Sequence, residues 1–113
     1  MKIYHNSRCR KSREALKTIQ NHTQEYEIIQ YMKDRLSFEE ISSIIKKLKL
    51  NPISLIRKNE NLWKQNYKDK KLSDMEIIKI MQDNPKLIQR PIVVSDDRAI
   101  IARDIEKVKD FFN

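Results

Sequence analysis

The chain has no glycine among its 113 residues. Phosphate loops of the Walker and Rossmann types need glycine for tight turns and for close approach of the backbone to phosphate. The sequence therefore excludes both classes of nucleotide site. It also contains no apolar run long enough to span a membrane, and residues 1–5 lack the apolar core of a secretory signal peptide. We expect no membrane association.

Cysteine occurs only once, at Cys9. A single cysteine forms no internal disulfide, and together with the missing signal peptide this favours a reducing cytoplasm. His5 and His22 are far apart and do not complete a zinc-ligand pattern with Cys9. We expect neither a metal site nor a bound cofactor.

Charge is abundant and unbalanced, with a formal net charge of +8. Such an excess attracts nucleic acids, anionic lipids, phosphate and other oxyanions. Many of the lysines, however, stand next to acidic residues in expected helices, as on an ordinary solvated surface. Phe38, Trp63 and Tyr67 are not spaced as a platform on which bases could stack. We therefore expect no nucleic-acid binding and interpret these aromatic residues as packing.

The first third of the chain has the pattern of a βαβ unit. Residues 2–4 and 25–31 are rich in β-branched and aromatic side chains, which predicts two strands. Residues 9–21 between them place Ala15, Leu16 and Ile19 on one helical face. A strand, a helix and a strand within about 30 residues predict a parallel pair with a right-handed crossover.

The middle of the chain, residues 37–84, is predicted to be helical. Ser37 and Ser73 are each followed three residues later by a glutamate, the signature of a capping box. Pro52 opens a short helical segment between the two helices that these serines begin. Asn84 and Pro85 end the second helix.

The last part returns to strands. Residues 91–94 and 99–102 predict an antiparallel hairpin, and Asp104 is the expected cap of a final helix. We predict an α/β protein with a thioredoxin-like fold, in which a four-stranded mixed sheet carries helices on its faces. Residues 1–113 are expected to form a single domain whose helical insert covers about residues 37–84.

Cys9 follows a strand and begins a helix, among Arg8, Arg10 and Lys11. Free N–H groups, the helix dipole and nearby cations all stabilise a thiolate. The alternative is a small buried core residue, but Cys9 lies in a polar, cationic loop. We interpret Cys9 as a redox nucleophile. Ser12 stands where dithiol proteins carry a second cysteine, and because a hydroxyl cannot resolve a mixed disulfide, an external thiol must do so.

Arg57, Arg90 and Arg103 each follow an apolar stretch. Arginine binds tetrahedral oxyanions through paired hydrogen bonds, although spacing alone favours an ordinary surface charge for each of these residues. Pro91 begins the expected hairpin strand. In thioredoxin-like folds the proline at this place is often cis and faces the active cysteine, whereas an ordinary strand-initiating proline is trans. We predict a cis bond beside Cys9.

Three segments together resemble the glutaredoxin-coupled arsenate reductase family, which also includes the Spx-type regulators. Residues 4–13 (YHNSRCRKSR) are similar to its active-site segment, residues 55–59 (LIRKN) to its L-x-R-K-N segment, and residues 87–94 (LIQRPIVV) to its L-I-x-R-P-I-V-V segment. The three matches occur in the family's order and span nearly the whole chain.

The resemblance implies that Cys9 attacks arsenate and that Arg57, Arg90 and Arg103 are catalytic arginines that bind the oxyanion. It places His5, Asn6 and Ser12 in support of the thiolate. It also implies that glutathione and glutaredoxin act as external reductants of a cytoplasmic monomer whose substrate is arsenate or a related small oxyanion.

Two departures from the family pattern matter. Ser7 replaces the usual proline of the active-site loop, and Ala102 and Asp104 flank Arg103 where the family has glycine and proline. Arg103 is therefore the weakest of the three matches. The alternatives are a Spx-like redox regulator that binds RNA polymerase and a redox-inert domain. Spx proteins typically carry Cys-x-x-Cys, so the Cys-x-x-Ser of this chain favours the enzyme.

Overall fold

The computed structural model describes residues 1–112 and divides the chain into two compact units. The first unit combines residues 1–34 with the chain from Arg90 onward, and the second spans residues 35–89. The helical segments between the two sequence halves of the first unit thus form a unit of their own.

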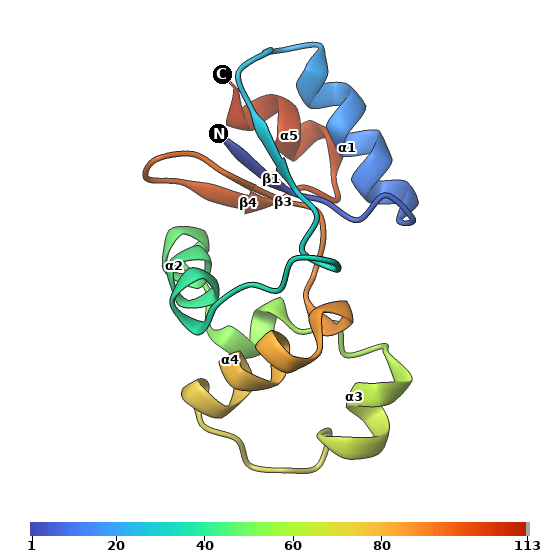
Figure 1. The fold of residues 1–113 in the computed structure, drawn as a ribbon, viewed down its shortest axis with the longest axis vertical. Coiled ribbons are helices and arrows are strands. Elements are labelled where there is room, and N and C mark those ends of the chain that lie inside the picture. Colours follow the sequence, from blue (N-terminus) through green and yellow to red (C-terminus); the bar gives the residue numbers. More distant parts are fainter. Residues whose placement is uncertain (113) are drawn as a thin grey trace. The chain divides into compact units, whose positions relative to one another are not determined.

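The first unit is built on a mixed sheet with the strand order β2-β1-β3-β4 (Figure 1). Its strands are β1 (Lys2–Tyr4), β2 (Glu27–Ile29), β3 (Ile92–Val94) and β4 (Ala99–Ile101). Strands β1 and β2 run parallel, whereas β3 pairs antiparallel with both β1 and β4. The predicted four-stranded mixed sheet, its βαβ unit and its hairpin are confirmed.

Helices α1 (Arg10–Gln20) and α5 (Ile105–Phe111) pack together against this sheet (Figure 1). Ile3 and Val93 lie opposite each other in neighbouring strands and are fully buried beneath the helices. The shared core consists of Ile3, Ala15, Ile19, Val93, Ala102, Val108 and Phe111. Truncating an isoleucine in such a core to alanine costs about 2–5 kcal/mol. This packing fixes the end of β1 relative to the start of α1.

The second unit is helical. It contains α2 (Phe38–Leu48), the 3₁₀ turn η1 (Pro52–Leu55), α3 (Asn61–Asn66), α4 (Asp74–Asp83) and the turn η2 (Pro85–Leu87). Ser37 accepts a hydrogen bond from the Glu40 N–H, and Ser73 forms a complete capping box with Glu76. Helix α2 ends at Lys49, whose φ of 57° and ψ of 41° lie in the left-handed region.

The largest differences from the sequence prediction concern β2, β3 and α3. Strand β2 covers three residues rather than seven. Strand β3 begins after Pro91, because proline has no N–H to donate to a sheet. Helix α3 was not predicted, since its six polar-rich residues show no helical period.

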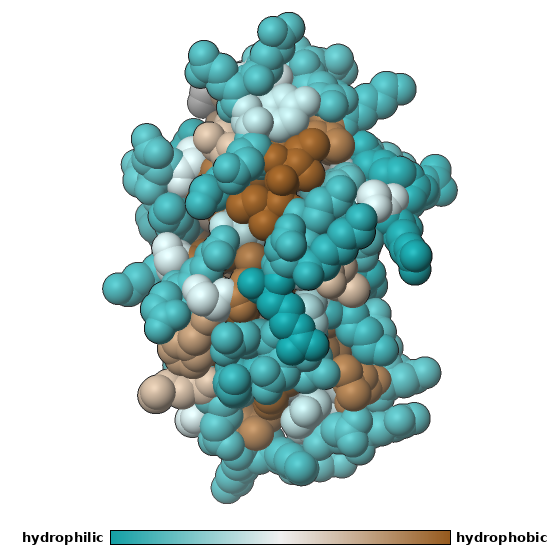
Figure 2. Space-filling view, viewed as in Figure 1, coloured by the Kyte–Doolittle hydropathy of each residue, from teal (hydrophilic) through white to brown (hydrophobic). Residues whose placement is uncertain are grey.

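The visible face of the molecule is mainly hydrophilic, with apolar patches between charged side chains (Figure 2). Within residues 1–112, no helix combines the length and the apolar character needed to cross a bilayer.

Candidate active site

The loop that carries Cys9 is held by hydrogen bonds rather than by glycine or proline. The Cys9 N–H donates to the carbonyl of Asn6 at 3.0 Å, and the Arg8 N–H donates to the Asn6 side chain at the same distance. Arg13 reaches back from α1 and donates to the Ser7 carbonyl at 3.0 Å. These bonds close residues 6–9 into a turn that delivers Cys9 to the N-terminus of α1.

Cys9 is the N-cap residue of α1 and is partly buried. Burial raises the pKa of its thiol, but hydrogen bonds outweigh this effect and lower the pKa to about 7. The donors are the Ser12 N–H and hydroxyl, the Arg90 guanidinium and the Lys11 N–H. Amides at a helix start and a nearby cation both favour the anion. Cys9 therefore titrates near neutral pH, so its thiolate is accessible there.

Ser12 faces the sulfur from one turn into the helix. Its side chain is fully buried, and its hydroxyl oxygen has no hydrogen-bond partner of ordinary geometry within residues 1–112. The hydroxyl instead stabilises the ionised sulfur of Cys9. This hydrogen bond favours the thiolate over the neutral thiol and so lowers the pKa of Cys9.

Arg90 comes from the far end of the chain and meets Cys9 in the first unit. The Arg90–Pro91 peptide bond is cis, as predicted, and β3 begins directly after it. The Pro91 carbonyl accepts the Ala102 N–H at 2.7 Å, which ties this point to the end of β4. The Arg90 side chain hydrogen-bonds the Cys9 sulfur. The predicted proximity of this segment to Cys9 is thereby confirmed.

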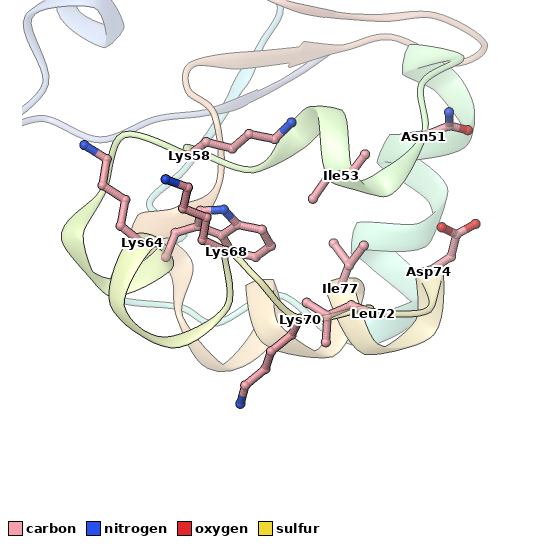
Figure 3. A pocket seen from close by; sticks show the side chains of 10 residues that line it. Asn51, Ile53, Lys58, Lys64, Lys68, Lys70, Leu72, Asp74 and Ile77 are labelled. Carbon is pink, nitrogen blue, oxygen red and sulfur yellow. The ribbon is translucent and has the colours of Figure 1, made fainter.

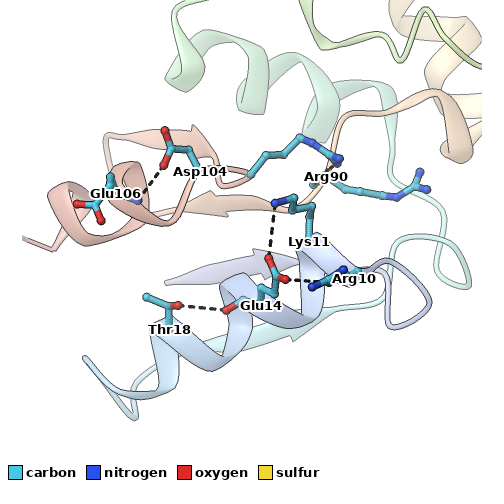
Figure 4. A network of polar contacts seen from close by, with 8 residues as sticks. Arg10, Lys11, Glu14, Thr18, Arg90, Asp104 and Glu106 are labelled. Atoms are coloured by element: carbon cyan, nitrogen blue, oxygen red, sulfur yellow. Dashed lines mark hydrogen bonds and ion pairs between the residues drawn. The ribbon is translucent and has the colours of Figure 1, made fainter.

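Arg103 contacts the backbone of Arg90. Its Nη1 donates to the Arg90 carbonyl at 2.8 Å, and its side chain is part-buried. Arg103 therefore fixes the backbone from which the Arg90 guanidinium extends. The adjacent Asp104 caps α5 by accepting the Glu106 N–H at 2.9 Å (Figure 4). The aspartate that departs from the family pattern thus has a structural task.

His5 and Asn6 make hydrogen bonds that hold the chain before Cys9. Among the described residues, the groups that shift the pKa of Cys9 include neither of them. His5 is buried, and its backbone N–H donates to the Ile29 carbonyl at 2.9 Å. Burial, and to a lesser extent the charge of Arg13, lowers the pKa of its imidazole. The imidazole is consequently neutral at physiological pH. Its Nδ1 has no hydrogen-bond partner within residues 1–112.

Arg57 belongs to the second unit, just after η1. Its backbone N–H donates to the Leu87 carbonyl at 2.7 Å, and its side-chain Nη2 lies 3.7 Å from a carboxylate oxygen of Glu60. Its Nη1 is buried and lacks a hydrogen-bond partner within residues 1–112. The guanidinium is thus held by its own unit and keeps donor capacity for an anion. Its convergence with Cys9 remains a prediction.

Sequence reasoning missed one feature of the site, the backbone N–H of Lys11, which acts on the sulfur beside that of Ser12. The signal was present in principle, because residues two and three after an N-cap always present free N–H groups. The Lys11 side chain points elsewhere: Glu14 pairs with its ammonium at 3.7 Å and with Arg10 at 3.0 Å (Figure 4). The described residues contain no group of His, Cys, Asp or Glu that could hold a metal ion.

Comparison with known proteins gives consistent matches. The profile of the ArsC family matches residues 4–111. The chain is 37% identical to the arsenate reductase of Haemophilus influenzae, over 94% of this chain and 93% of that protein. It is 40% identical to the uncharacterized protein YfgD of Escherichia coli K12, over 96% of this chain and 92% of that protein. The structure of an arsenate reductase from Vibrio cholerae superposes with a TM-score of 0.90 at 38% identity, covering 97% of each chain.

Proposed function

This chain belongs to the ArsC family, and from that premise we propose that it is an oxidoreductase that reduces arsenate or a related oxyanion through the thiolate of Cys9. The observation that carries the proposal is the environment of the sulfur. Two helix N–H groups, a buried hydroxyl and a guanidinium lower the pKa of Cys9 to about 7, so the nucleophilic form is available at neutral pH.

The reaction needs two thiols for each oxyanion. The Cys9 sulfur bonds to arsenic as one arsenate oxygen leaves as water. A glutathione thiol then completes the two-electron reduction, so that arsenite and a disulfide between Cys9 and glutathione are formed. Because Cys9 is the chain's only cysteine, a further external thiol must reduce this disulfide. We assign that step to glutaredoxin, in the cytoplasm, with the protein acting as a monomer.

The same guanidinium that favours the thiolate also suits the substrate. A thiolate that approaches arsenate meets like-charge repulsion, and fixed donors aimed at the oxyanion lower this barrier. Arg90 touches the sulfur and offers a planar fork of donors, while Arg103 holds its backbone. We propose Arg57 as the third arginine of the oxyanion site.

The test is a coupled assay of arsenate reduction. The full chain is mixed with arsenate, glutathione, glutaredoxin, glutathione reductase and NADPH, and NADPH consumption is followed. We expect turnover that requires arsenate, glutathione and glutaredoxin and that Cys9→Ser abolishes. Lys17→Ser, an exposed change on the same helix, is the matched control and should retain turnover. Turnover that persists in Cys9→Ser would overturn the assigned nucleophile, and the absence of arsenate-dependent turnover would overturn the substrate.

A further inference from the structure

The second unit contains a pocket of about 680 Å³ that the chemistry of Cys9 does not use. Its size lies within the range of about 300–1,000 Å³ typical of small-molecule sites. All of its lining residues come from the segment between Asn51 and Ile77. The pocket is therefore described completely within one unit, and that unit has no cysteine.

One wall of the pocket carries a lysine rim, which consists of Lys58, Lys64 and Lys68 (Figure 3). Lys58 comes from the loop after η1, and Lys64 comes from α3. Lys68 follows in the turn where its N–H donates to the Trp63 carbonyl at 3.0 Å. Residues 64 and 68 are four apart in this helical turn, so the fold places both on one side.

The lysine rim lacks directly paired carboxylates in the described part of the chain. Within residues 1–112, none of its three ammonium groups forms an ion pair with a carboxylate. Glu60, one turn before Lys64, pairs with Arg57 instead. By contrast, Lys79 and Lys109 each pair with an acidic residue on their own helix. Three neighbouring cations that no carboxylate pairs with directly attract an anion from solution.

The other walls are mainly apolar and include one acidic residue, Asp74. Trp63, Ile53, Leu72 and Ile77 line the interior, and Trp63 is only 5% exposed. Asp74 lies on the side opposite the lysine rim (Figure 3). An anionic group would thus face the lysine rim, away from Asp74. Lys70 also contributes to the lining, but its ammonium turns outward and lies 5.8 Å from the centre of the Tyr67 ring.

We propose that this pocket binds a small organic anion with at least two negative charges and a compact apolar body. The lysine rim takes the charged end, and Trp63 with its aliphatic neighbours takes the apolar body. An inorganic anion would satisfy only the first contact. A long acidic peptide without a compact apolar group would contact the lysine rim alone.

The chain supplies its own reporter, because Trp63 is its only tryptophan. Trp63 emission in the full-length protein is followed during separate titrations with phenyl phosphate, phthalate and inorganic phosphate. The first two probes distinguish an organic phosphate from an organic dicarboxylate, and the third tests charge alone. We expect saturable binding of at least one organic probe, about tenfold or more tighter than that of inorganic phosphate. Added salt should weaken it.

Variants test the assigned contacts. Lys64→Glu with Lys68→Glu should weaken binding of the organic probe by about tenfold or more, because charge-assisted bonds are lost. Lys71→Glu makes the same kind of change at an exposed neighbour that does not line the pocket, and it should have a much smaller effect. Cys9→Ser should bind normally, which separates this site from the reductase proposal. Equal effects of the two charge reversals, equal affinity for inorganic phosphate, or no saturable binding of either organic probe would overturn the proposal.

Discussion

The sulfur of Cys9 is governed by competition between partial burial, which favours the neutral thiol, and four donors, which favour the anion. The donors prevail and place the pKa at about 7, against about 8.5 for a free cysteine. The thiolate is the reactive form. The rate of alkylation by iodoacetamide should therefore rise with pH, reach half its maximum near pH 7 and level off above.

Alkylation reports Cys9 alone, because the chain has no other cysteine. The same titration of the urea-unfolded chain is the control, since unfolding removes the folded arrangement of the donors. Its midpoint should move up toward about pH 8.5. Identical midpoints for the folded and unfolded protein would contradict the assigned environment.

Ser12 separates reactivity from stability at a single side chain. Its buried hydroxyl stabilises the Cys9 thiolate but lacks an ordinary partner, so Ser12→Ala should raise the pKa of Cys9. Removing this hydroxyl deletes only its interaction with the sulfur, so the free energy of unfolding should fall by no more than about 1 kcal/mol. Thr18→Ala removes a hydroxyl from the same helix that bonds the Glu14 carbonyl. It should leave the alkylation midpoint unchanged, and a shift as large as that of Ser12→Ala would count against a specific contact.

At the scale of elements, the absence of glycine has a visible cost at the end of α2. Lys49 adopts a left-handed conformation that glycine reaches without strain and that other residues reach at about 1–2 kcal/mol. Glycine also gains entropy in the unfolded chain, worth about 0.5–1 kcal/mol. Lys49→Gly should therefore raise the free energy of urea unfolding by up to about 1 kcal/mol.

The position-matched comparison is Lys46→Gly, three residues earlier and also exposed. There the backbone is helical, and glycine should lower stability by about 0.5–1 kcal/mol. Opposite signs for the same substitution would identify backbone geometry as the cause. A loss of stability in both variants would show that the left-handed strain at Lys49 is too small to matter.

Elements with strong local signals were predictable from sequence. Ser73 and Glu76 predicted the start of α4, because a capping box satisfies two backbone donors locally. Asp104 likewise predicted the start of α5, of which it is the N-cap. The strand predicted over residues 25–31 was too long, since its β-branched content signals only propensity, whereas its pairing is set by the three-residue length of β1. Helix α3 lacks a local signal, and tertiary packing around the buried Trp63 accounts for it.

At the scale of the whole molecule, the candidate site combines what sequence could and could not predict. Cys9 and Ser12 are one helical turn apart, so their proximity follows from the helix alone. Arg90 is 81 positions after Cys9, and its contact with the sulfur exists only because β3 pairs antiparallel with β1. Periodicity gave no information on that contact, and only the thioredoxin-like fold assignment and the family resemblance connected the two residues.

The arginines test whether both units serve one reaction, since Arg90 and Arg103 belong to the first unit and Arg57 to the second. Arg57→Lys, Arg90→Lys and Arg103→Lys keep the charge but lose the planar fork. We expect Arg90→Lys to be the most harmful in the coupled arsenate assay, with about a hundredfold loss of turnover. Arg103→Lys should be the mildest of the three, because Arg103 acts through the Arg90 carbonyl.

The alkylation midpoint of Cys9 distinguishes the roles of the three arginines. Arg90→Lys should change both turnover and the midpoint, because the Arg90 guanidinium bonds the sulfur directly. Arg57→Lys should lower turnover without moving the midpoint, because Arg57 is not among the groups that act on the Cys9 thiol within residues 1–112. Such a split would mean that the second unit contributes an oxyanion donor to the chemistry of the first. Wild-type turnover in all three variants, with Cys9→Ser inactive, would instead make the arginines surface charges and refute the oxyanion assignment.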